Sequence, residues 1–159
     1  MTKEQIQSYT LRVSQASKTE MIIILYDLVL DNIKTAKENL AAGEKEAYHK
    51  DLKETGKFLS ELMKILDFSV PLSYNLMSLY MYSQRLLVRA DVGEAPDKLA
   101  DIEMVINKLK AGFEGIKDRD ESGPMMTNVQ QVYAGLTYGK GHLNEAYINA
   151  SDYNRGFNA

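Results

Sequence analysis

Apolar residues in the first 121 positions recur at spacings of three and four residues, the period of an α-helix, in four separate stretches. The first stretch follows Ser17-Lys18-Thr19-Glu20, a capping box in which the serine and glutamate side chains each accept a backbone N–H. Gly43 suits a left-handed cap at its end. The two-residue alternation of a strand is not sustained anywhere in residues 1–121. The four apolar rows are Ile22, Tyr26, Val29, Ile33, Ala36 and Leu40; Tyr48, Leu52, Thr55, Leu59, Leu62 and Leu66; Leu72, Leu76, Leu79, Ser83, Leu86 and Ala90; and Leu99, Ile102, Ile106, Leu109, Phe113 and Ile116.

The four helices have similar lengths and short connections. Each spans about three heptads, or about 30 Å at 1.5 Å per residue. Ser69 is predicted to cap the third helix, with Pro71 tolerated in its first turn. Helices of equal length joined by short links pack best in alternating directions. The sequence therefore predicts an all-α fold, an antiparallel up-down four-helix bundle with an N-terminal cap segment and a C-terminal extension.

Charged residues are unevenly distributed along the chain. Residues 122–159 carry only four of its charged side chains and are rich in Tyr, Asn and Gly. The change in composition coincides with Gly123-Pro124, where a helix cannot continue. We therefore predict an N-terminal cover segment (1–16), a bundle domain (17–121) and a low-charge tail (122–159).

Composition and motifs argue against several classes of protein. Cysteine is absent, the net charge is −3, and the longest apolar run, Met21–Tyr26, is far shorter than the roughly 20 residues that span a membrane. The N-terminus lacks the apolar stretch of a secretory signal. A single Glu-x-x-His motif, Glu46 to His49, is too little for a di-iron bundle. We expect no enzymatic activity, cofactor or metal, no nucleic-acid binding and no membrane insertion.

Three of the helices hold more apolar residues than a bundle stripe of about three positions in seven requires. Residues 21–30 are apolar all round except for Asp27. One interpretation is a wide core stripe with a few exposed apolar side chains; the other is a second, partner-facing groove in which Met and Tyr are favoured. Spacing alone does not separate the two.

Residues 75–91 read Asn-Leu-Met-Ser-Leu-Tyr-Met-Tyr-Ser-Gln-Arg-Leu-Leu-Val-Arg-Ala-Asp. This string resembles the signature of the flagellin export chaperone family of the FliS type, Asn-Leu, Leu-Tyr-x-Tyr, Arg-Leu and Ala-Asn, with Asp91 at the final Asn. Leu25-Tyr26-Asp27 is similar to the family's Leu-Tyr-Asp, and Phe113 stands where the family usually has Trp. The resemblance covers residues 6–117.

The resemblance implies a four-helix bundle that acts as a chaperone in the bacterial cytoplasm. Such a protein binds the C-terminal segment of flagellin in apolar grooves, prevents premature polymerisation and delivers flagellin to a component of the flagellar export gate. An alternative is a helical adaptor for another amphipathic flagellar regulator or export component. Ile6 and Tyr9 are predicted to form a displaceable N-terminal cover. The candidate flagellin-binding residues are Ile24, Leu28, Phe58, Ile65, Met77, Tyr80 and Met81.

Two further points have competing interpretations. Tyr80 is either part of the groove or a tyrosine at the edge of the core with its hydroxyl in water. The tail has amphipathic potential in Val129, Val132, Tyr133 and Leu136. It either mimics flagellin and occupies the groove, in cis or on a neighbouring chain, or is a solvated extension.

Overall fold

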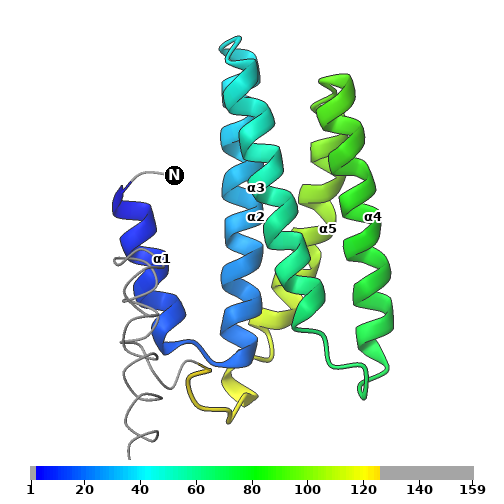
Figure 1. Ribbon diagram of the computed structural model, residues 1–159. Helices are drawn as coiled ribbons and strands as arrows, with labels where there is room; N and C mark the ends of the chain where they lie inside the picture. Colours follow the sequence, from blue (N-terminus) through cyan, green and yellow to red (C-terminus); the bar gives the residue numbers. More distant parts are fainter. Residues whose placement is uncertain (1–2, 126–159) are drawn as a thin grey trace, which may run out of the picture. The chain divides into compact units, whose positions relative to one another are not determined.

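In the part of the chain that the structure describes, four long helices pack in a ring, and a shorter helix precedes them (Figure 1). The computed structural model describes residues 3–125. Helix α2 packs against α3 and α5, and α4 also packs against α3 and α5, so α2 and α4 occupy opposite corners of the ring. This arrangement confirms the predicted all-α bundle. The elements are α1 (Lys3–Gln15), α2 (Lys18–Ala41), α3 (Lys45–Lys64), α4 (Leu72–Gly93), α5 (Asp97–Glu114) and a 3-10 turn η1 (Lys117–Arg119).

The capping box at the start of α2 is formed as predicted. Ser17 Oγ accepts the Glu20 N–H at 3.2 Å, and Glu20 Oε2 accepts the Ser17 N–H at 2.8 Å. The other end of α2 is closed by Gly43, whose φ of +80° a residue with a side chain rarely adopts.

Asp120 joins the segment after α5 to the first turn of α2. Its Oδ2 accepts the Thr19 N–H at 2.9 Å, and its Oδ1 accepts the Ser122 hydroxyl and N–H. These hydrogen bonds favour the ionised carboxylate, so they hold the pKa of Asp120 well below its usual value.

Replacing Asp120 with Asn should lower the free energy of unfolding at pH 7. Because the folded pKa is depressed, the carboxylate stabilises the fold above its unfolded pKa of about 3.9, and this contribution is lost as the pH falls through the folded value. Urea unfolding of both proteins from pH 7 to pH 2 should therefore show a stability difference that shrinks below about pH 4. A difference that stayed constant over that range would contradict the role given to the carboxylate.

The predicted apolar rows of α2 and α3 form the centre of the core, and four of the six positions in the α2 row are completely buried. In α5 the row is correct up to Phe113, which packs partly buried against the core. The prediction was wrong for Ile116, which is exposed because α5 ends at Glu114, one turn too early to carry it inward.

Two of the six positions in the row predicted for α4 were wrong by one residue. Leu72 is exposed and Leu79 only partly buried, whereas Ser73 and Tyr80 face the core. Both rows keep three- and four-residue spacing and share Leu76, so period alone does not choose between them. The buried residues of α4 are Ser73, Leu76, Tyr80, Ser83, Leu86, Leu87 and Ala90.

The predicted cap of α4 is also corrected. Ser69 does not cap the helix, because both its N–H and its hydroxyl donate to Asp67 Oδ1, at 3.0 and 2.7 Å. The Ser73 hydroxyl, in the first turn, donates to the carbonyl oxygen of Asp67 at 2.6 Å. The turn between α3 and α4 is thus organised around Asp67, and α4 begins at Leu72.

Candidate partner-binding surface

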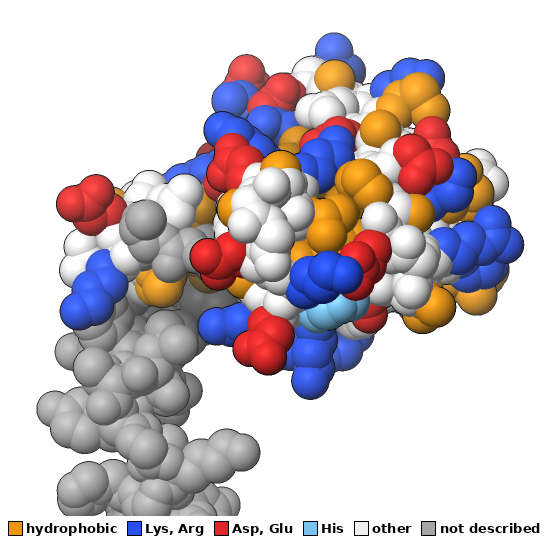
Figure 2. All heavy atoms as spheres, turned by 90° about the horizontal axis from the view of Figure 1, so that it is seen from above, with side chains coloured by type: hydrophobic (Ala, Val, Ile, Leu, Met, Phe, Trp, Pro, Cys, Tyr) orange, Lys and Arg blue, Asp and Glu red, His pale blue; other side chains and the backbone are white. Residues whose placement is uncertain are grey.

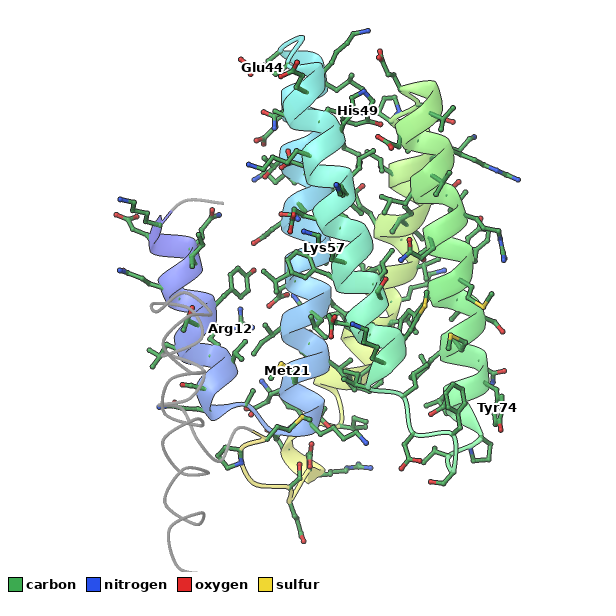
Figure 3. The ribbon with its side chains drawn as sticks, viewed as in Figure 1. Arg12, Met21, Glu44, His49, Lys57 and Tyr74 are labelled. Atoms are coloured by element: carbon green, nitrogen blue, oxygen red, sulfur yellow. The ribbon has the colours of Figure 1, made fainter. Side chains whose placement is uncertain are left out.

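Helix α1 lies against α2 through polar contacts and through Tyr9 and Val13, which pack partly buried against the core. The Tyr9 hydroxyl donates to Asp31 Oδ2 at 2.7 Å, and Arg12 Nη2 lies 2.7 Å from Asp27 Oδ2. The Arg12 guanidinium also stacks over the Tyr9 ring, 5.3 Å from its centroid. Figure 3 shows Arg12 reaching from α1 towards α2. No residue of α1 is fully buried, so the helix is attached without entering the core.

Asp27 connects three helices at one point. Besides Arg12 of α1, it pairs with Lys110 Nζ of α5 at 2.7 Å, and its side chain is mostly buried. The hydrogen bond to Asp27 raises the pKa of Lys110, which keeps this ammonium charged. The aspartate that interrupts the apolar stretch of α2 is therefore a junction between α1, α2 and α5.

The face of α2 that α1 covers carries apolar side chains beside the carboxylates of Asp27 and Asp31. Ile24 and Leu28 are one turn apart, as are Asp27 and Asp31, so all four share one side of the helix. Ile24 and Leu28 are both buried. Beside them a pocket of about 400 Å³ lies between α1, α2 and the end of α5. Its walls are Arg12, Gln15, Glu20, Ile23, Ile24, Asp27, Glu114 and Lys117.

The other candidate residues lie in different places. Phe58 and Ile65, of α3 and its C-terminal end, are partly buried and pack against the core. Met77 is partly buried and Met81 exposed, both on α4. Because α2 and α4 stand at opposite corners of the ring, the structure does not bring the candidates of these two helices into one groove.

Tyr80 is a core residue. Its hydroxyl shares a 2.5 Å hydrogen bond with the Tyr26 hydroxyl, so it does not project into water. Burial raises the pKa of Tyr80 to about 12. The Tyr26 ring in turn meets Phe113 edge-on, with centroids 5.8 Å apart. These contacts join α2, α4 and α5 through the centre of the bundle.

The predicted cover segment is a helix in which Tyr9 and Ile6 behave differently. Tyr9 is partly buried, with its hydroxyl on Asp31, and packs with Val13 against the core; Ile6 is half exposed. Sequence reasoning did not assign Arg12, Asp27 or Asp31 to this contact. For Asp27 the sequence did contain an indication of a special role, because it is the one charged residue within positions 21–30.

The described residues contain no group of three or more metal-ligating side chains from His, Asp and Glu. His49 Nδ1 instead lies 2.5 Å from Asp91 Oδ1 and connects α3 with α4 (Figure 3). None of the helices in residues 3–125 is long and apolar enough to cross a membrane. The amphipathic positions predicted in the tail, from Val129 onwards, lie outside the described residues.

Comparison with known proteins identifies one family. Residues 1–120 match the family model described as flagellar protein FliS. This match includes α1, the whole bundle and the 75–91 string. No curated protein matches the chain.

Proposed function

Since the chain belongs to the family of flagellar protein FliS, we propose that it binds the C-terminal segment of flagellin in the bacterial cytoplasm, on the face of α2 that α1 covers. Proteins of this family are flagellar export chaperones that bind flagellin-type partners, and the family is not one of enzymes. Binding there keeps flagellin from polymerising before export and presents it to a component of the export gate.

The observation that supports this proposal is the way α1 is attached. Free flagellin ends expose the apolar faces that pack together in the filament. A contact between exposed ionic groups stabilises by up to about 1 kcal/mol, whereas each apolar side chain buried on α2 contributes about 1.5–3 kcal/mol. A flagellin helix that buries two or three more of its own apolar side chains against α2 than the Tyr9 and Val13 that α1 contributes would therefore displace α1.

The proposed surface consists of Ile24 and Leu28 on α2, and Phe58 and Ile65, partly buried on α3 and at its end, are not assigned to it. Tyr9 anchors the cover, and Ile6 belongs to the segment that moves with it. Met77, Tyr80 and Met81 are not included, because the first and last lie on α4 and Tyr80 lies in the core.

Calorimetric titration with the C-terminal segment of flagellin from the same bacterium tests the proposal. We expect one-to-one binding with a negative heat-capacity change, the sign of apolar burial. Absence of binding by the full-length protein and by a variant lacking residues 1–14 would contradict the proposed function, because the second protein has no cover to displace.

Weakening the contacts that hold α1 against α2 should strengthen flagellin binding. Replacing Tyr9 with Phe and Arg12 with Gln removes the hydrogen bond to Asp31 and the ion pair to Asp27. If these contacts together stabilise the closed state by about 2 kcal/mol, the double variant should bind flagellin up to about 30-fold more tightly. Leu11→Gln, an exposed position of the same helix, is the matched control and should leave the affinity unchanged. Equal affinities for the double variant and the wild type would show that α1 does not cover the site.

A further inference from the structure

Helix α4 carries an apolar row on the side that faces away from the core. Tyr74, Met81 and Val88 follow one another at intervals of seven residues, and Val92 lies one turn further on. Their exposed fractions are 61%, 48%, 59% and 83%. From Tyr74 to Val92 the row extends for about 27 Å, the length of a five-turn helical contact. Figure 3 shows Tyr74 at the end of this helix, beside the turn from α3.

Tyr74 packs against the Phe68 ring of the preceding turn, with centroids 5.2 Å apart, but the bundle gives no reason for the other three residues of the row. Three of the buried positions of α4 are the small residues Ser73, Ser83 and Ala90, while larger apolar side chains point outwards. Val88 and Val92 are β-branched, which makes them poorer helix formers than the polar residues usual on an exposed face. Neither packing nor helix propensity therefore accounts for the outward Met81, Val88 and Val92.

The charges beside the row are basic. Arg85 and Arg89 are exposed on α4, and no carboxylate in the described residues lies within 4.0 Å of either guanidinium. The acidic residues near the end of the helix are engaged elsewhere, Asp91 with His49 and Glu94 with Lys45. Figure 2, seen from above, shows hydrophobic side chains beside Lys and Arg at the right-hand edge, where α4 lies in Figure 1.

We propose that the outward face of α4 binds a second protein partner, an amphipathic helix whose apolar residues repeat every seven positions and whose flanking residues are Asp or Glu. The apolar row would pack along the partner's row, and the two arginines would pair with its carboxylates. Tyr, Met and Arg are the residue types enriched at the centres of protein interfaces.

Charge and topology distinguish this partner from two other occupants. A second copy of the chain paired through α4 would bring four arginines together without an intervening carboxylate, which is unfavourable. The flagellin surface proposed above lies on α2, at the opposite corner of the ring, so both partners bind at once. The α4 face is therefore a docking surface beyond the proposed chaperone site.

The test uses the full-length protein and a fluorescent designed peptide. The peptide forms a helix with a seven-residue Leu repeat flanked by Glu, and a second peptide has Lys at the flanking positions. Fluorescence anisotropy should show that the Glu peptide binds at least tenfold more tightly than the Lys peptide. The Met81→Glu, Val88→Glu double variant should lose this binding at least tenfold, and Met104→Glu, an exposed apolar position on α5, should retain it.

Charge reversal distinguishes the proposed interaction from nonspecific hydrophobic binding. The Arg85→Glu, Arg89→Glu variant should prefer the Lys peptide, with circular dichroism unchanged. Three results would overturn the proposal: no binding of the Glu peptide, no change of preference in the reversed variant, or displacement of the peptide by the C-terminal segment of flagellin. Self-association of the chain that Met81→Glu and Val88→Glu abolish would also overturn it, since a second copy would then be the occupant.

Discussion

Replacing Leu28 with Glu should weaken binding of the C-terminal flagellin segment by about 100-fold or more. The change removes a buried apolar contact of about 2 kcal/mol and places a carboxylate in an apolar interface, and together these cost about 3–4 kcal/mol of binding free energy. Asp27 and Asp31 on the same face add repulsion. Calorimetric titration measures the loss directly.

The matched control for this variant is Met104→Glu. It makes the same kind of change, from apolar to acidic, at an exposed position of a different helix, α5. Circular dichroism and urea unfolding must show that the Leu28→Glu protein is folded before its affinity is compared, because Leu28 belongs to the buried core cluster. Normal flagellin affinity in a folded Leu28→Glu protein would remove α2 from the proposed surface.

Truncating Tyr80 to Ala should lower the free energy of unfolding by about 3–5 kcal/mol, because a large, fully buried side chain is lost from the centre of the bundle. Urea unfolding followed by circular dichroism gives the value. The same loss would be absent if Tyr80 were a surface residue awaiting a ligand.

A double-mutant cycle isolates the hydroxyl contact. Tyr80→Phe leaves the buried Tyr26 hydroxyl without its partner and should cost about 1–3 kcal/mol, as should Tyr26→Phe. The double variant removes both polar groups, so it should be no less stable than either single variant. Additive losses would show that the two hydroxyls do not depend on each other.

Tyr80 also shows where sequence reasoning reached its limit for the fold. Helical period predicted which stretches fold and where α2 begins, because capping and periodicity are local. On α4, however, two rows with the same spacing were possible, and the buried one is the row that brings Tyr80 into hydrogen-bonding contact with Tyr26, 54 positions away. A tertiary hydrogen bond of that kind leaves no trace in the spacing of one helix.

A related problem limited how much of the candidate surface could be predicted from the sequence. Ile24 and Leu28 could be chosen from excess apolar character, but the same criterion also chose Met77 and Met81, which lie on another helix at the opposite corner. Excess hydrophobicity identifies helices with two apolar sides without indicating which sides meet. The polar contacts that define the α2 face, through Arg12, Asp27 and Asp31, join residues 15 and 22 positions apart.

The connection between α1 and α2 is very short, since α1 ends at Gln15 and α2 begins at Lys18. A displaced α1 therefore stays within a few ångströms of the surface it left, at an effective local concentration of about millimolar or more. On the proposed function, it would compete with the bound flagellin segment and return as that segment begins to detach. Under the proposed function, the empty protein would expose its apolar face only briefly, and return of α1 would reset the site after flagellin is released.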